Sequence, residues 1–224
     1  MNVVYAMTRN VYEWALPSIR SLAHFHPDAR VFIVCEDDEF PLELPIKVET
    51  INVSGQTIFP ADGPNYKNQF TYINLLKVVY PALLPVKKVI HLDIDTIVCG
   101  KLDELWKTDV TGKWFAAVPQ YRGEYHSIFN CYYNMGVALI NLAQMRKDKA
   151  SDEMVEYLNT VKTQWADQDA WNMWVDRAVA VPVRFNENWA TGETNFPAIV
   201  HYCGIGNWFN NPGMYRGEYL EAWR

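Results

Sequence analysis

Two hydrophobic runs separated by a helical pattern make up the first 35 residues, and this arrangement limits the possible folds more than any other feature. Asn2–Met7 and Arg30–Cys35 are short and almost continuously hydrophobic, as is typical of buried strands. Between them, Tyr12–Phe25 repeats hydrophobic residues at the spacing of an amphipathic helix, which ends before Pro27. A strand, a helix and a strand in this order predict a βαβ unit with parallel strands.

The rest of the chain continues this alternation, so we expect one mixed α/β domain that covers residues 1–224. Residues 36–64 are rich in proline and are expected to be mostly loop. From His201 to the end we expect a loop with one last turn of helix. The expected helices are Asn68–Tyr80, Ser151–Thr163 and Gln168–Trp174, and the expected strands are Val48–Val53, Lys88–Leu92, Phe115–Val118 and Gly136–Asn141.

Composition argues against several classes of function. The formal net charge of −6 disfavours binding to a nucleic-acid backbone, which requires a basic face. No hydrophobic run approaches the length of a transmembrane helix and no signal peptide is apparent, so no transmembrane segment is predicted. The four cysteines form no CxxC pair, and Cys35 and Cys99 end hydrophobic runs, which favours reduced thiols and a cytoplasmic location.

Two aspartates interrupt the strongly hydrophobic run Val89–Val98. Asp93 and Asp95 are separated by Ile94 alone, and in an extended chain residues i and i+2 point to the same side. Carboxylates that converge in this way repel each other unless a cation, a proton or a basic side chain lies between them. Because ligands of α/β sheets bind beyond the carboxyl ends of strands, this position favours a metal-linked role over a surface or capping role.

Two classes of enzyme place paired acids in this way. In a phosphohydrolase of the haloacid dehalogenase type Asp93 would be the nucleophile, but that motif usually lies near the chain start and is followed by a second paired-acid motif, which is missing here. In a nucleotide-sugar transferase both acids would hold a divalent cation against a diphosphate. Tryptophans crowd the last third of the chain, where they either fill the core or line a groove for a sugar ring: Trp165, Trp171, Trp174, Trp189 and Trp208.

Seven segments, in the same order along the chain, resemble motifs of glycosyltransferase family 8, the family of glycogenin and of bacterial lipopolysaccharide galactosyl- and glucosyltransferases. Each segment alone is a weak signal, and the resemblance depends on their common order. They are Ala6–Tyr12 (the nucleotide-binding loop), Lys77–Pro85 (Arg/Lys-Leu-x-x-Pro-x-Leu-x-Pro), His91–Asp95 (Tyr-Leu-Asp-x-Asp), Tyr133–Leu142 (Asn-Ser-Gly-Val), Asp167–Asn172 (Asp-Gln-Asp-x-Leu-Asn), Arg184–Asn186 (Arg-Phe-Asn) and His201–Gly204 (His-x-x-Gly).

The resemblance implies a GT-A fold, with a Rossmann-like mixed central sheet flanked by helices. It also implies an enzyme that transfers a hexose, glucose or galactose, from a UDP-sugar to a saccharide, lipid-linked or protein acceptor with retention at the anomeric carbon. The cation would be Mn²⁺, with Mg²⁺ as the alternative, held by Asp93, Asp95 and His201. An imidazole beside two carboxylates suits Mn²⁺ better than Ca²⁺. Taken alone, His201 could instead be a core histidine bonded to the backbone.

Through the same resemblance three residues take catalytic roles. Lys77 would place a positive charge near the departing diphosphate, while Asp167 and Gln168 would face the donor sugar. Without the resemblance, Lys77 could be a solvated lysine on a helix flank and Asp167 the N-cap of a helix. The residues expected to contact the nucleotide sugar are Ala6, Thr8, Arg9, Tyr12, Asp93, Ile94, Asp95, Asn134, Met135, Gly204 and Asn207.

Three positions depart from the family pattern. Asn207 stands where Gly-x-x-Lys-Pro-Trp has its lysine, and Met135 replaces the serine of Asn-Ser-Gly. Arg9 replaces a small polar residue, and Arg9 or Lys67 could supply the missing cationic contact. The missing lysine favours the main alternative function, a non-catalytic relative that binds a nucleotide sugar and transfers nothing.

Overall fold

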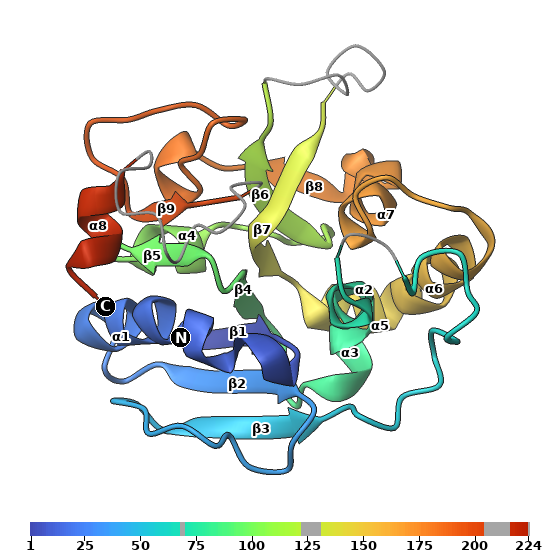
Figure 1. Ribbon diagram of the computed structural model, residues 1–224. Coiled ribbons are helices and arrows are strands. Elements are labelled where there is room, and N and C mark those ends of the chain that lie inside the picture. Colours follow the sequence, from blue (N-terminus) through green and yellow to red (C-terminus); the bar gives the residue numbers. More distant parts are fainter. Residues whose placement is uncertain (68–69, 122–130, 204–215, 224) are drawn as a thin grey trace.

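The central feature of the computed structural model, which describes residues 1–67, 70–121, 131–203 and 216–223, is a seven-stranded sheet (Figure 1). Its strand order is β3-β2-β1-β4-β7-β6-β8. The strands are β1 (Asn2–Ala6), β2 (Arg30–Cys35), β3 (Val48–Asn52), β4 (Val89–Leu92), β6 (Phe115–Pro119), β7 (Tyr133–Ile140) and β8 (Ala178–Ala180).

Strand directions make the sheet mixed. β1 is parallel to both β2 and β4, and β2 is parallel to β3, so the predicted βαβ unit and the predicted mixed α/β class are confirmed. β7 runs antiparallel to both neighbours, β4 and β6. The amino-terminal end of β7 therefore lies at the same edge of the sheet as the carboxyl-terminal ends of β1 and β4.

Helices cover both faces of the sheet, with α1 on one side and α5, α6 and α7 on the other (Figure 1). Several fall close to their predicted ranges. The helical segments are η1 (Arg9–Ala15), α1 (Leu16–Phe25), α2 (Tyr72–Leu75), η2 (Leu76–Val79), α3 (Tyr80–Leu83), α4 (Asp103–Lys107), α5 (Leu142–Asp148), α6 (Ala150–Thr160), α7 (Asp167–Met173), η4 (Val175–Arg177), η5 (Val183–Phe185) and α8 (Gly217–Glu221), where η denotes a 3₁₀ helix.

Two predicted helices are broken into shorter pieces. The helix expected from Tyr12 begins as the 3₁₀ segment η1, and α1 starts at Leu16 with Pro17 in its first turn. The helix expected over Asn68–Tyr80 consists of α2, η2 and α3, and its expected start lies outside the described residues. Pro81 explains the last break, since proline has no N–H for a continuous α-helix but is tolerated in the first turn of α3.

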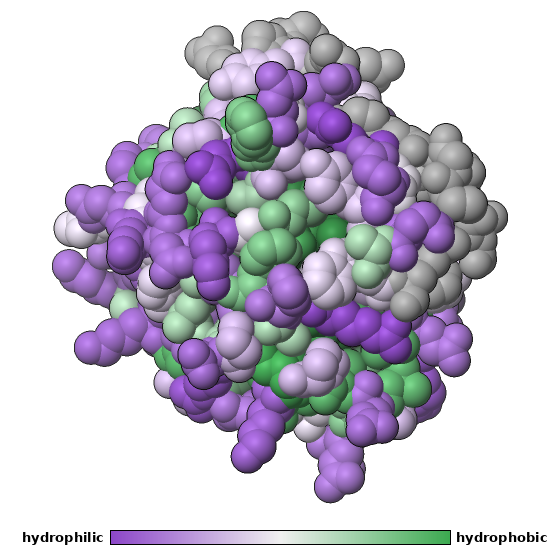
Figure 2. Space-filling view, turned by 90° about the vertical axis from the view of Figure 1, so that its left-hand side faces the viewer, coloured by the Kyte–Doolittle hydropathy of each residue, from purple (hydrophilic) through white to green (hydrophobic). Residues whose placement is uncertain are grey.

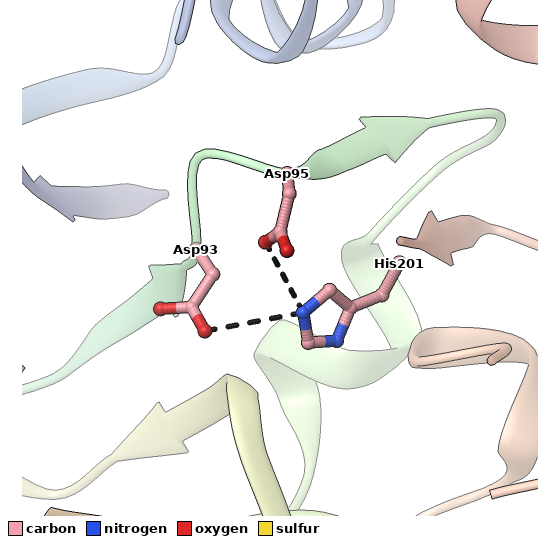
Figure 3. Close-up of side chains that lie close together, drawn as sticks. All are labelled: Asp93, Asp95 and His201. Atoms are coloured by element: carbon pink, nitrogen blue, oxygen red, sulfur yellow. Dashed lines mark ion pairs between the residues drawn. The ribbon is translucent and has the colours of Figure 1, made fainter. Parts of the chain in front are cut away.

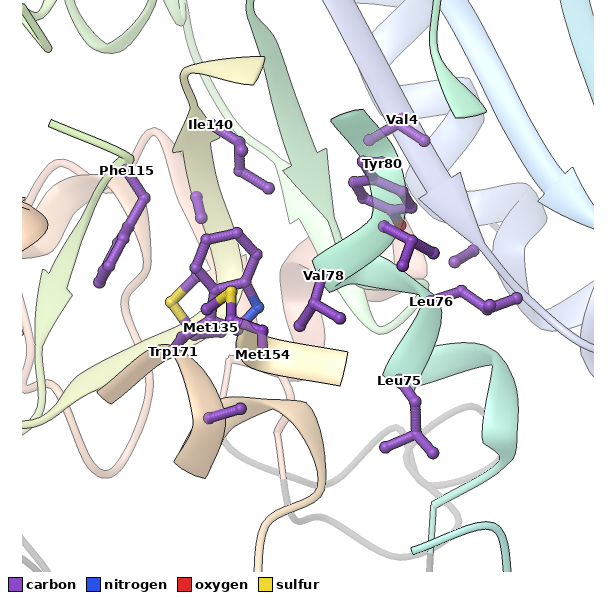
Figure 4. Packing of buried hydrophobic residues seen from close by; sticks show 14 of the residues in the cluster. Val4, Leu75, Leu76, Val78, Tyr80, Phe115, Met135, Ile140, Met154 and Trp171 are labelled. Carbon is purple, nitrogen blue, oxygen red and sulfur yellow. The ribbon is translucent and has the colours of Figure 1, made fainter. Parts of the chain in front are cut away.

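Alternate residues of the strands feed two hydrophobic layers. Val4 points into the layer under α2, α3, α6 and α7, whereas its neighbours Val3 and Tyr5 point into the layer under α1 and α4. Figure 4 shows the first layer, where Trp171 of α7 packs near Phe115 of β6. Their ring centroids are 5.3 Å apart, and burial of each such side chain contributes about 1.5–3 kcal/mol.

A second, two-stranded sheet was not predicted from the sequence. β5 (Thr96–Val98) pairs antiparallel with β9 (Ile199–His201), and the Tyr202 amide donates to the Asp95 carbonyl at 2.9 Å. This pairing brings β9, about 100 residues further along the chain, beside the turn that follows β4. The predicted loop from His201 onward therefore begins one residue too early, because His201 is the last residue of β9.

Hydrophilic side chains cover much of the face shown in Figure 2, with hydrophobic patches between them. Among the described residues, the helices are too short and too polar to cross a bilayer. All four cysteines have free thiols.

Candidate functional site

The two aspartates of the β4 motif converge on one histidine from β9 (Figure 3). His201 Nε2 lies 3.2 Å from Asp95 Oδ1 and 3.9 Å from Asp93 Oδ2. The carboxylate oxygens and the ring nitrogen that these residues offer all lie within 4.8 Å of one another. Two carboxylates and one imidazole in this arrangement form a donor set that fits a divalent cation such as Mn²⁺.

The backbone geometry of the acid pair differs from the prediction. Asp93 follows β4, but Ile94 and Asp95 form a turn that leads into β5, so the segment is not extended. The carboxylates meet because the chain turns after β4 and because β9 presents a histidine to both. Asp93 and Asp95 do lie close together, but alternation of side chains along a strand is the wrong explanation for it.

Hydrogen bonds hold the ring of His201 in one orientation. Asn186 Nδ2 donates to Asn134 Oδ1 at 2.8 Å, which leaves Asn186 Oδ1 to accept from His201 Nδ1 at 2.8 Å. With one proton on Nδ1, the ring turns Nε2 toward Asp95. Burial opposes a charge on this ring, but Asp95 and Asp93 outweigh it and raise the pKa of His201, and a cation held between the carboxylates would take the place of a proton on Nε2. His201 is thus buried but bonded to side chains, not to the backbone as the alternative interpretation assumed.

Gly136 of β7 makes room for this ring. A Cβ atom at residue 136 would lie 2.0 Å from His201 Cε1, and 2.8 Å from each ring nitrogen. Contacts shorter than 3.0 Å are essentially never seen for a real Cβ. The backbone of Gly136 also accepts a hydrogen bond from the Asp93 amide at 2.7 Å. Glycine at this position therefore lets the His201 ring and the strand that precedes the acids approach the same point.

A buried lysine links the acid pair to α7. Lys77 Nζ lies 2.9 Å from Asp93 Oδ1 and 3.6 Å from Asp167 Oδ2, and its side chain is only 5% exposed. Lys77 is therefore not a solvated lysine on a helix flank. Burial alone would lower the pKa of Lys77, but Asp167 and Asp93 outweigh it and raise that pKa.

Asp167 is the first residue of α7, and the N-cap position belongs to Ala166. Its Oδ2 atom is buried and has no hydrogen-bond partner among the described residues. Burial raises the pKa of Asp167 to about 7. The charge of Lys77 lowers this pKa, but the charge of Asp93 raises it and offsets part of the effect of Lys77. A buried carboxylate oxygen without a hydrogen bond, next to a lysine, is suited to accept a hydrogen bond from a hydroxyl group of a ligand.

His91 of β4 supports the acid pair from the interior. Its Nε2 atom lies 2.8 Å from Asp93 Oδ1, and its Nδ1 atom lies 3.2 Å from the Tyr80 hydroxyl. Burial, together with the nearby charge of Lys77, lowers the pKa of His91 to about 4. The pKa of Asp93 is also lowered: burial opposes ionisation, but Lys77 and His91 outweigh it.

A pocket of about 350 Å³ opens beside these groups, at the carboxyl ends of β1 and β4. The amino-terminal end of β7 and the start of α7 complete its wall. Eleven residues that were predicted to act in catalysis, donor binding or metal binding line this pocket: Ala6, Thr8, Lys77, Asp93, Ile94, Asp95, Asn134, Met135, Asp167, Gln168 and His201.

Four other predicted residues are not brought into the described pocket lining. Arg9 forms an ion pair with Asp37 at 2.7 Å, and the Tyr12 hydroxyl donates to the same carboxylate at 2.9 Å while its ring is buried. Asp37 thus holds both side chains at the end of β2, and their contact with uridine stays a prediction. Gly204 and Asn207 lie outside the described residues.

Aromatic residues form part of the pocket wall. Of the tryptophans that could fill the core or line a groove, Trp165 and Trp189 line the pocket, whereas Trp171 is a core residue and Trp174 packs against the core. Trp208 lies outside the described residues. Trp189 is 48% exposed, and its indole nitrogen donates to the Cys203 carbonyl.

Sequence reasoning assigned no role to Asn186, Gly136 and His91, although each contacts a predicted metal-binding residue. All three lie inside motifs that were noted for the resemblance. The Arg-Phe-Asn motif contained a signal, because an asparagine in a hydrophobic segment requires hydrogen-bond partners. Ala166, with φ of 50°, is a further unpredicted feature, and this uncommon conformation directs the chain into α7 next to the pocket.

Comparison with known proteins identifies the family of this chain. The family model described as "Glycosyl transferase family 8" matches residues 2–210. The chain belongs to glycosyl transferase family 8. Among relatives, glycosyltransferase GlyA of Streptococcus pneumoniae serotype 4 is 23% identical over 216 residues, which are 89% of this chain and 31% of GlyA. General stress protein A of Bacillus subtilis is 25% identical over 61% of this chain and 58% of its own length. The chain thus spans about a third of GlyA.

Solved structures of similar shape confirm the GT-A fold for this family 8 member. The galactosyltransferase LgtC, in complex with donor and acceptor sugar analogs, superposes with a TM-score of 0.76 at 22% identity, covering 100% of this chain and 95% of LgtC. The apo form of the glycosyltransferase GlyE of Streptococcus pneumoniae TIGR4 has a TM-score of 0.78 at 17% identity, over 99% of this chain and 59% of GlyE.

Proposed function

We propose that this glycosyltransferase moves a hexose, glucose or galactose, from a UDP-sugar to an acceptor, with a divalent cation and with retention at the anomeric carbon. The observation that carries the proposal is the Asp93–Asp95–His201 cluster at the wall of the pocket. Mn²⁺ suits this donor set, and Mg²⁺ is the alternative. When bound, the cation supplies positive charge that compensates the negative charge developing on the departing diphosphate.

The residues of the chain itself account for the remaining requirements of transfer. Lys77 is held between Asp93 and Asp167, so its ammonium group lies beside the Asp93–Asp95–His201 cluster, which supports a role in stabilising charge on the departing diphosphate. Asn134 Oδ1 accepts hydrogen bonds from the Gly136 amide and from Asn186 Nδ2. These two bonds hold the side-chain amide of Asn134 at the pocket wall. Amide and carboxylate groups at these positions can select the orientation of sugar hydroxyls.

Asp167 supports retention by a front-face route, in which the departing phosphate takes the proton of the acceptor. In that route Asp167 orients the sugar and offsets positive charge on its ring. Double displacement would instead require Asp167 as a nucleophile on the face away from the diphosphate. The contact between Asp167 and Lys77 favours the first role, because it holds the carboxylate on the side of the diphosphate-binding lysine.

The proposed partners follow from the same site. The donor is a nucleotide sugar, and the acceptor is a saccharide, free, lipid-linked or on a protein. The exposed ring of Trp189 at the pocket supports a saccharide, since sugar rings stack on indoles. We also propose a cytoplasmic location, which the four free thiols support.

A donor screen tests the proposal. UDP release is measured for a series of UDP-sugars with Mn²⁺, with Mg²⁺ and with EDTA, and the anomeric proton of the product is examined by NMR. We expect release with a UDP-hexose only when a divalent cation is present, and a product that keeps the α configuration. Tight UDP binding with no transfer to any acceptor would favour the non-catalytic alternative. Phosphate release from an aryl phosphate without a sugar donor would favour a phosphohydrolase.

A further inference from the structure

A buried chain of polar groups reaches Asp93 from the interior of the domain. The Tyr80 hydroxyl contacts His91 Nδ1 at 3.2 Å, and His91 Nε2 contacts Asp93 Oδ1 at 2.8 Å. Tyr80 and His91 are both 0% exposed. The family pattern has tyrosine where this chain has His91, so the contact is a property of this chain and needs its own explanation.

The chemistry of the groups determines the direction of these hydrogen bonds. Lys77 Nζ lies 2.9 Å from Asp93 Oδ1, which keeps Asp93 a carboxylate, and a carboxylate can only accept. His91 must therefore carry a proton on Nε2 and donate it to Asp93. The ring is buried, and its Nδ1 pairs with the Tyr80 hydroxyl at 3.2 Å, which holds the ring in the orientation in which Nε2 points to Asp93.

The two oxygens of Asp93 consequently have different roles. Oδ1 accepts from two donors, Lys77 at 2.9 Å and His91 at 2.8 Å. Oδ2 is the oxygen that faces His201, at 3.9 Å from Nε2. A carboxylate clamped through one oxygen presents the other in a fixed direction, and outer groups of this kind raise metal affinity.

We propose that His91, held by Tyr80, is a positioning residue that clamps Asp93 Oδ1 so that Oδ2 alone is presented to a divalent cation. This inference rests on the proposed function only in that the Asp93–Asp95–His201 cluster binds such a cation. It assigns to His91 a role through Asp93, without contact to the cation or to the substrate. It also requires the Nε2–H tautomer of His91.

The first experiment determines this tautomer in the metal-free protein. Long-range ¹H–¹⁵N spectra of histidine-labelled protein separate the two nitrogens of each ring, and the spectrum of His91→Gln assigns the His91 signals. We expect a ring that carries a proton at Nε2, with a shift at Nδ1 that changes in Tyr80→Phe. A ring protonated at Nδ1 alone would overturn the inference, because it could not donate to Asp93.

The second experiment measures Mn²⁺ affinity by titration calorimetry, with Mn²⁺ alone and with UDP present. His91→Leu should lower the affinity by about 10-fold to 100-fold. His91→Gln should stay close to wild type, since its amide nitrogen can replace Nε2 as donor. Tyr80→Phe removes one hydroxyl from an intact fold, and we expect a smaller loss, of about 5-fold.

His26→Leu is the matched control. His26 accepts a hydrogen bond from the Leu102 amide at 3.0 Å and does not line the pocket, so its loss should leave Mn²⁺ affinity unchanged. Thermal melting of every variant shows which of them fold. Equal Mn²⁺ affinity of wild type, His91→Leu and Tyr80→Phe would overturn the inference while leaving the proposed function intact. Ordered losses in Mn²⁺ affinity without any sugar transfer by the wild type would uphold the inference and contradict the proposed function.

Discussion

Gly136→Ala tests whether the position of His201 depends on the absence of a side chain at residue 136. The added Cβ would lie 2.0 Å from His201 Cε1, and contacts under 3.0 Å are essentially never observed, so the ring must move by about 1 Å or more. The atom it meets belongs to a ring that is 3% exposed and bonded to Asn186 at 2.8 Å. Such overpacking costs about 1–3 kcal/mol of folding free energy.

The same shift should weaken cation binding more than it weakens the fold. A movement of this size breaks the hydrogen bond to Asn186 and the 3.2 Å approach of Nε2 to Asp95. Loss of an orienting contact alone lowers metal affinity by about 10-fold to 100-fold, and displacement of the ligand itself should reach at least that range. Mn²⁺ affinity is measured by titration calorimetry and stability by urea unfolding.

Two controls make the test specific. Gly100→Ala places a Cβ at 3.7 Å from the Ala198 Cα, which is an ordinary contact, so this variant should bind Mn²⁺ like wild type. In a His201→Ala background, Gly136→Ala should cause no further loss of Mn²⁺ affinity, because the side chain with which it collides is gone. Wild-type Mn²⁺ affinity in Gly136→Ala would refute the reasoning.

Three further predictions concern the acids and the pocket wall. Asp95→Ala should abolish the dependence of UDP affinity on Mn²⁺. It should also reduce turnover by several orders of magnitude, which is the scale of losing a catalytic metal. Equal UDP affinity of the wild type with EDTA and with Mn²⁺ would contradict this prediction. Because the pKa of Asp167 is raised from 3.8 to about 7 in the folded state, this group binds more protons when the protein is folded, so its contribution to stability should fall as pH rises from about 4 to about 7, whereas the lowered pKa of His91 acts in the opposite sense. Compared with wild type, Asp167→Asn should therefore gain stability as pH rises through this range, in urea unfolding with a chelator present, and the same pH dependence in both proteins would refute the assignment. Trp189→Ala should raise the KM for a saccharide acceptor and leave UDP affinity unchanged. Trp223→Ala is the control: it removes an indole that contacts His24 outside the pocket, and it should change neither quantity.

The sequence predicted the long elements better than the short ones. β1 and β2 were correct because continuous hydrophobic runs beside an amphipathic helix leave few other arrangements. β5, β8 and β9 have three residues each, which is too few for an alternation of hydrophobic and polar residues to be recognised. The antiparallel direction of β7 could not be predicted either, because a hydrophobic run has the same pattern whether its strand is parallel or antiparallel to its neighbours.

The site shows a similar division. The resemblance brought together Asp93, Asp95 and His201, and the structure places them within reach of one cation. The partners of Lys77 could not be predicted, since a lysine in a helical pattern has the same appearance whether it is solvated or buried. Arg9 shows the converse, because the half-buried carboxylate of Asp37 after β2 binds a side chain that was expected at the nucleotide.

The sequence by itself determined the chemical inventory: acids and an imidazole beside hydrophobic runs, where unpaired charge is costly and a ligand or counter-charge is required. Only the tertiary structure decided which atoms face one another. His201 meets Asp95 because β9 pairs with β5, more than 100 residues away in the chain, and Gly136 opposes Asp93 because of the register between β4 and β7. Such registers result from many weak packing contacts across the whole core, and no local pattern in the sequence encodes their sum.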